Sequence, residues 1–202
     1  GQETLKVISS GKDNVSIGKE SGKDLTTGEE NVFLGLSAGC RTTTGKANVF
    51  IGRNVGTANE DGEFNVAIGC GALSGGGTGV KQCLNIAFGR MAGQYTTTGS
   101  KNFFAGNYAA KCNVSGSNNF YVGNYSGMCA CSGSGNFAIG QNSLKGSGTH
   151  ASNIYKKNIG FGENAGCGIS SGCYNVIFGH TAAENISTGN DNIIVGRDAV
   201  GD

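Results

Sequence analysis

Apolar and polar positions recur along this chain with a period of 17 residues. Each repeat begins with an Asn, which is followed by three mostly apolar residues and a Gly. Only two of the ten intervals between successive Asn residues differ from 17, and both are longer. Such a short period predicts a stack of coils, because one unit cannot bury its apolar face without its neighbours. The repeated residues are Asn14, Asn31, Asn48, Asn65, Asn85, Asn102, Asn119, Asn136, Asn158, Asn175 and Asn192.

The three residues between Asn and Gly predict one short strand per coil. The first and third of them are apolar in every repeat, and β-branched or aromatic residues dominate both columns. Such residues suit a pleated surface, and alternate residues of a strand share a face. We therefore expect the first and third columns to form the interior of the solenoid.

The middle column of the strand is then expected to face outward, although nine of its eleven residues are apolar. A long exposed apolar stripe normally marks an interface. A second layer from the same chain would also cover it, but no residues remain to build one. We therefore predict a homo-oligomer assembled along this column. The predicted interface residues are Phe33, Phe50, Phe104, Tyr121, Ile177 and Ile194.

The remaining positions predict two corners in each coil. The residue seven positions after each Asn is always small, as expected inside a tight corner, and a Thr, Ser or Asp followed by Gly marks a second turn. Each coil should therefore contain two short strands and two turns. The stacked Asn side chains should form a hydrogen-bonded ladder. Extra residues near 80–84 and 146–157 should bulge at the second corner.

The expected fold is all-β, a parallel β-solenoid or β-roll of eleven coils with a 17-residue repeat. Residues 14–202 form the solenoid domain, and residues 1–13 are a lead-in or cap strand. At roughly 4.8 Å per coil the rod would be about 50 Å long. Because the sequence opens and stops within a repeat, we expect it to be cut from a longer fibre protein.

Repeats such as Asn65-Val-Ala-Ile-Gly69 and Asn136-Phe-Ala-Ile-Gly140 resemble the head repeats of YadA-like trimeric autotransporter adhesins. The fuller unit from Asn31 to Gly45 looks more like the repeats of bacteriophage tail-fibre and virion appendage proteins. The resemblance implies a homotrimeric β-roll that serves surface attachment. The period of 17 is longer than the adhesin repeat and favours the tail fibre. The resemblance transfers no specific binding residues.

Composition narrows the possible partners. The net charge is +1 and only 14% of residues are charged, which disfavours nucleic acid and anionic membranes as partners. No segment reaches the roughly 20 apolar residues that a membrane-spanning helix needs. The chain has 38 Gly but no Pro and no three-residue period, which excludes collagen. We therefore expect neither nucleic-acid binding nor membrane insertion.

The eight cysteines do not recur as a column, so the fold should not depend on them. Three pairings are open by position, Cys112 with Cys129, Cys70 with Cys83, and Cys167 with Cys173, and the alternative is a set of small buried thiols. Zinc is not expected, because Cys129 and Cys131 are too close in sequence for the usual ligand spacing. Asp does not recur at the fixed positions that calcium rolls use, so we predict no metal site.

The sequence predicts no enzyme and no cofactor, because no column supplies a carboxylate pair or a nucleophile beside a base. One surface group is a candidate for sugar contact. Tyr108 and Tyr125 occupy the same position in successive coils, beside Asn107 and Asn124, and aromatic rings with amides suit sugar faces and hydroxyls. The alternative is an ordinary aromatic ladder or part of a subunit contact.

The function expected from these observations is a rigid shaft or head of a phage virion fibre that serves host-surface attachment. Its partners would be further copies of itself, with a trimer favoured, other fibre or baseplate proteins, and a host-surface glycan. A bacterial cell-surface trimeric adhesin head is the first alternative, which would place the chain on the bacterial surface. A glycan-degrading tailspike-like enzyme is the second.

Overall fold

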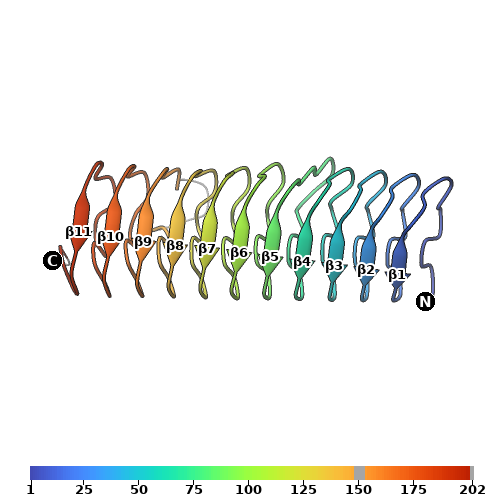
Figure 1. The fold of residues 1–202 in the computed structure, drawn as a ribbon, viewed down its shortest axis with the longest axis horizontal. Coiled ribbons are helices and arrows are strands. Elements are labelled where there is room, and N and C mark those ends of the chain that lie inside the picture. The colour runs from blue at the N-terminus through green and yellow to red at the C-terminus, as the bar shows by residue number, and fades with distance from the viewer. Residues whose placement is uncertain (148–152, 201–202) are drawn as a thin grey trace.

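The computed structural model describes residues 1–147 and 153–200, which coil into a β-solenoid (Figure 1). Within these residues there are eleven strands of three residues each and no helix. Every strand occupies the three residues between an Asn and a Gly, as the repeat predicts. The strands are β1 (Val15–Ile17), β2 (Val32–Leu34), β3 (Val49–Ile51), β4 (Val66–Ile68), β5 (Ile86–Phe88), β6 (Phe103–Ala105), β7 (Phe120–Val122), β8 (Phe137–Ile139), β9 (Ile159–Phe161), β10 (Val176–Phe178) and β11 (Ile193–Val195).

The strands form one parallel sheet in chain order, so each coil lies on the one before it. Pairing joins equivalent residues of successive repeats, for example Val15 with Val32. The two longer repeats keep this register, because Val66 pairs with Ile86 and Phe137 with Ile159. The two ends of the chain lie at opposite ends of the rod (Figure 1). The predicted parallel β-solenoid is thus confirmed.

The prediction of which strand residues face inward was wrong. The middle residue of each strand lies in the interior, and the first and third residues lie on the outer surface. Of the residues expected to face outward, Phe33, Phe50, Phe104, Tyr121 and Ile177 have no exposed surface, and Ile194 is 7% exposed.

The Asn residues explain this orientation. Each Asn lies two positions before the middle residue of its strand, so both point to the same side of the backbone. The amide of Asn48 donates to Asn31 Oδ1 at 3.0 Å and to the carbonyl oxygen of Gly62 at 2.8 Å, inside its own coil. Asn31 Oδ1 also accepts the backbone N–H of Asn48 at 3.0 Å. Equivalent amide contacts link the other Asn residues, so the predicted ladder is confirmed and lies in the interior.

The Gly after each strand is required by both its backbone angle and its packing. Gly69 has φ of +132°, a region that side chains rarely adopt. A Cβ at Gly69 would lie 2.5 Å from the carbonyl oxygen of Gly89 in the next coil. The coils therefore stack closely only because this column has no side chain.

The narrow interior is filled by combining large with small residues, within one coil or between neighbouring coils. Phe33 faces Gly39, where a Cβ would lie 2.8 Å from the phenyl ring. In β4 the middle residue is Ala67, and the residue equivalent to Gly39 is Leu73. Leu73 has φ of 43°, so positive φ alone does not demand Gly at this position. The space left by the residues of this coil and its neighbour decides it, because Leu73 also occupies the space beside Gly93 in the next coil. The small column one residue earlier is buried as expected, except at Ala199 in the last coil, which is partly buried.

The predicted second strand of each coil is not formed in the described residues. That side consists of turns with three isolated bridges, Asn59 to Val80, Cys83 to Ser100 and Lys156 to Cys173. Two residues of the corner, such as Ser37 and Gly39, have φ of 54° and 57°, which interrupts extended backbone. Residues 1–13, all of them described, also contain no strand. They lie along the first coil through backbone hydrogen bonds such as Leu5 to Ser21.

Candidate functional site

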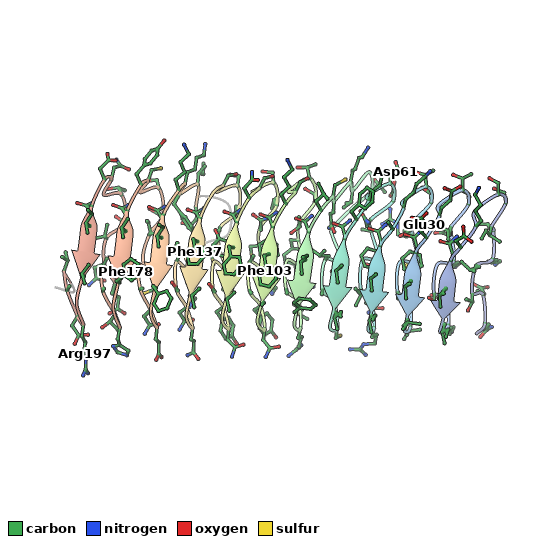
Figure 2. The ribbon with its side chains drawn as sticks, in the orientation of Figure 1. Glu30, Asp61, Phe103, Phe137, Phe178 and Arg197 are labelled. Atoms are coloured by element: carbon green, nitrogen blue, oxygen red, sulfur yellow. The ribbon has the colours of Figure 1, made fainter. Side chains whose placement is uncertain are left out.

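The outer surface of the sheet is apolar along its whole length. Its two columns are the first and third residues of each strand, and we call them together the outer face. Figure 2 shows Phe103, Phe137 and Phe178 on this surface, at separate strands. The columns are Val15, Val32, Val49, Val66, Ile86, Phe103, Phe120, Phe137, Ile159, Val176 and Ile193, and Ile17, Leu34, Ile51, Ile68, Phe88, Ala105, Val122, Ile139, Phe161, Phe178 and Val195.

None of these side chains is fully buried in the single chain. Away from the ends of the rod, the exposed fraction reaches 37% at Phe137 and 47% at Phe161. At the last strand it is 80% for Ile193. A continuous apolar surface over every strand is larger than the scattered apolar residues that soluble monomers tolerate.

The outer face is locally ordered by stacked aromatic rings. The rings of Phe103 and Phe120 stack with centroids 4.8 Å apart, and those of Phe120 and Phe137 are 4.9 Å apart. Phe161 and Phe178 stack at 5.8 Å in the other column. A shallow hollow near the first stack is lined by Leu84, Ile86, Lys101, Asn102, Phe103, Asn118, Asn119 and Phe120. The face therefore presents ridges of stacked aromatic rings.

The six residues predicted to contact another copy cannot do so, because their side chains are enclosed by their own coil. Phe33 stacks on Phe50 with centroids 5.4 Å apart, and Phe104 stacks on Tyr121 at 5.9 Å, both inside the solenoid. Tyr121 is so deeply enclosed that burial raises the pKa of its phenol well above the usual value. Any sheet-to-sheet contact must use the outer face instead.

The structure brings the predicted sugar-contact residues together. Tyr108 and Tyr125 stack with centroids 5.2 Å apart and planes inclined by 4°. Asn107 and Asn124 are exposed beside them, and Asn124 Oδ1 accepts the backbone N–H of Asn107 at 3.0 Å. Because the rings cover one another, each has one face fewer for a sugar. Sugar binding here stays a prediction.

Two cations and a third ring join this cluster, and sequence reasoning missed them. The guanidinium of Arg90 lies 5.3 Å from the centroid of Tyr108, and Lys111 Nζ lies 5.4 Å from it. Lys111 Nζ is also 5.7 Å from the ring of Tyr95. The repeat could have revealed Arg90, because it lies five residues after the Asn of its coil and Tyr108 lies six residues after the Asn of the next coil.

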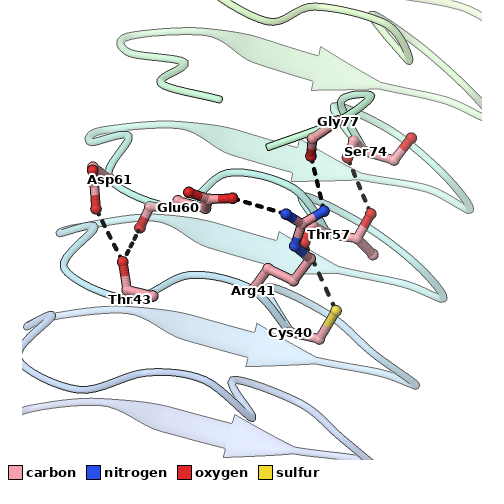
Figure 3. A network of polar contacts seen from close by, with 8 residues as sticks. All are labelled: Cys40, Arg41, Thr43, Thr57, Glu60, Asp61, Ser74 and Gly77. Atoms are coloured by element: carbon pink, nitrogen blue, oxygen red, sulfur yellow. Dashed lines mark hydrogen bonds and ion pairs between the residues drawn. The ribbon is translucent and has the colours of Figure 1, made fainter. Parts of the chain in front are cut away.

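A polar network fixes the first insertion to the coils before it (Figure 3). Arg41 donates to the carbonyl oxygen of Gly77 at 2.8 Å and to Glu60 Oε1 at 2.8 Å. Thr43 donates to Asp61 Oδ1 at 3.0 Å in the same region. The bulging residues lie just before the predicted 80–84, because Val80 already bridges to Asn59 of the preceding coil and is buried. The second predicted insertion, 146–157, lies partly outside the described residues.

Two of the disulfides left open by the sequence are not formed: Cys70 and Cys83 are thiols, and so are Cys167 and Cys173. Cys112, Cys129 and Cys131 are buried. Burial, followed by the nearby Cys129 and Cys131, raises the pKa of the Cys112 thiol to about 11. A buried thiol with a raised pKa is a poor nucleophile.

The titratable groups nearest to a catalytic arrangement lie around His180. Its Nε2 is 4.0 Å from Glu163 Oε2 and its Nδ1 is 3.9 Å from Asp198 Oδ1. All three side chains are about half exposed, and these distances are too long for hydrogen bonds. In residues 1–147 and 153–200 no group of three or more potential metal ligands converges, and no helix suited to crossing a bilayer is found.

Comparisons with known proteins leave the outer face as the main guide to function. No protein-family model matches the chain, and neither the curated proteins nor the solved structures give a match.

Proposed function

We propose that this chain is a rigid segment of a homo-oligomeric surface fibre, in which several copies bury their outer faces against one another. The observation that carries the proposal is the continuous apolar outer face. Both of its columns are apolar at every level, although the interior of the solenoid is already filled by other residues. Apolar area of this extent lowers the free energy of association when it leaves water.

The remaining features suit a fibre rather than a catalyst. Backbone ladders and the Asn ladder run the length of the rod, which stabilises a stiff and elongated shape. The repeats resemble those of phage tail fibres, which makes a virion fibre for host attachment the favoured setting and the bacterial adhesin head its alternative. A trimer is the favoured assembly. Other fibre proteins and a host-surface glycan are its proposed partners.

The test is the native mass of the purified chain and of two matched variants. Phe120→Lys places a charge in the centre of the outer face, whereas Ser115→Lys places the same charge on an exposed corner away from it. We expect the parent and Ser115→Lys to have a mass of three chains, and Phe120→Lys to shift toward one chain. A parent that remains a single chain at tens of micromolar would refute the proposal.

A further inference from the structure

We propose that the copies in this assembly run parallel and in register, so that each coil faces the same coil of its neighbour. This inference rests on the proposed function, and it is carried by residues that border the outer face. One border is the residue before each Asn, and the other is the residue after each strand-ending Gly. Figure 2 places Glu30 above β2 and Arg197 below β11, on these two borders.

Where a coil carries a charge on both borders, the two charges are opposite. In the described residues, three coils have a charged residue other than His on both borders, and in each coil the two signs are opposite. All six side chains are exposed. The pairs are Asp13 with Lys19, Lys157 with Glu163, and Asp191 with Arg197. In the first and last pairs the acidic residue lies before the Asn, whereas in the middle pair the basic residue, Lys157, lies there. The match therefore does not arise from one border being acidic and the other basic along the whole rod.

These pairs cannot close inside one chain, because the two borders lie on opposite sides of the strand. Six residues of nearly extended chain span roughly 20 Å. Within the chain the charges make exposed contacts with other partners, for example Lys19 with Glu20 at 3.9 Å and Arg197 with Asp198 at 3.3 Å. The complementarity is therefore available to a second copy.

A rotation axis parallel to the rod brings the two borders of neighbouring copies together. Rotation about this axis turns the outer faces of the copies toward one another. In each coil, the border before the Asn of one copy then meets the border after the Gly of the same coil in the next copy. Asp13 of one copy then faces Lys19 of the next, and the other two pairs meet in the same way. This holds for two copies or three, since both arise from rotation about such an axis.

Other arrangements lose this match. An antiparallel pair related by an axis along the strands would bring Asp13 opposite Asp191, and Lys19 opposite Arg197, so like charges would meet at both ends. A shift by one coil removes all three pairs. Apart from His, one direction leaves a single opposite pair, Glu30 with Lys19, and sets Lys101 against Arg90, while the other leaves only Glu30 with Arg53. Exposed ion pairs add little affinity, but like charges in contact select against wrong partners and wrong registers.

The sizes of the apolar side chains agree with this register. No level of the outer face carries two aromatic residues, and the shortest residue, Ala105, shares its level with Phe103. The parallel arrangement places the first column of one copy against the third column of the next. Phe103 then faces Ala105 of the neighbour, which avoids both a clash and a cavity.

The experiment is zero-length carbodiimide coupling in an assembly refolded from a mixture of ¹⁴N- and ¹⁵N-labelled chains. Peptide mass spectrometry then identifies each coupled Lys and carboxylate, and whether they come from different chains. We expect mixed-label links between Asp13 and Lys19 and between Glu163 and Lys157. Lys23 lies 3.2 Å from Glu3 in one chain and provides the link that should carry a single label.

Two variants serve as controls for assignment. Asp13→Asn should remove only the link to Lys19, and Glu163→Gln should remove only the link to Lys157, while native mass stays unchanged. A mixed-label link between Lys19 and Glu30 would indicate a shift of one coil and overturn the inference. So would a multimer that gives the Lys23 control link but neither expected link. In that case the proposed function would stand, whereas a single-chain mass would refute both.

Discussion

The inner and outer sides of the same three-residue strands are both apolar, but they follow different rules. On the inner side, residue size varies from Phe50 to Ala67 in successive coils, and the opposite residue of the coil compensates. On the outer side, neither column contains a polar residue or a Gly. Only the inner side is covered in the single chain.

This difference shows that apolar content alone does not identify the core of a narrow solenoid. The interior holds one strand side chain per coil, and it tolerates small residues because a partner such as Leu73 or Leu144 fills the remaining volume. The outer face has no such partner within the chain. Its uniform composition is what a surface needs when another sheet must pack on it.

Neighbouring residues of β6 provide the strongest test of this comparison. Phe104 is fully buried and Phe103 is half-buried. Phe104→Ala should lower the free energy of unfolding by about 3–5 kcal/mol at any protein concentration, because it leaves a cavity. Phe103→Ala should have an effect that grows with protein concentration, since it weakens association. Denaturant unfolding at several concentrations measures both. Equal, concentration-independent losses would break the comparison.

A double-mutant cycle at Phe33 and Gly39 tests whether the inner side is filled by paired volumes. Gly39→Leu alone should cost about 1–3 kcal/mol, because the new side chain meets the Phe33 ring. Phe33→Ala alone should leave a cavity. The double variant recreates the Ala67 and Leu73 combination and should be more stable than either single variant. Additive losses in thermal unfolding would contradict paired filling.

Two substitutions in the Gly column separate strain from close stacking. Gly69→Val should cost about 1–3 kcal/mol from its backbone angle, with a further loss from contact with Gly89. Gly196→Val has φ of +133° but meets only Ala199, at 3.6 Å. It should therefore be the milder variant in melting experiments. Similar losses at both sites would assign the whole effect to the backbone angle.

Much of this fold is predictable from the repeat. The Asn and Gly spacing gives the strand bounds, the parallel register, the small corner residue and the Asn ladder, because each is a local consequence of a stacked period. The inward side was mistaken because both sides are apolar. A buried partner for the Asn amide, which points to the same side as Phe50, would have settled it.

The second strand and the surface cluster were harder to predict for different reasons. Non-Gly residues with positive φ, such as Ser37 and Met91, carry no strong signal in sequence, so the turns on that side read as extended chain. Tyr108 and Tyr125 were paired correctly by their shared column. Lys111 lies three residues from Tyr108 in the same coil, and only the folded turn brings it over the ring.

The Asn ladder also gives the rod a direction for folding. In each step the later Asn donates and the earlier one accepts, as with Asn65 and Asn48. A completed coil therefore presents an acceptor to the coil that is synthesised next. We expect a chain emerging from the ribosome to add its coils one at a time onto this template, so that folding follows the order of synthesis.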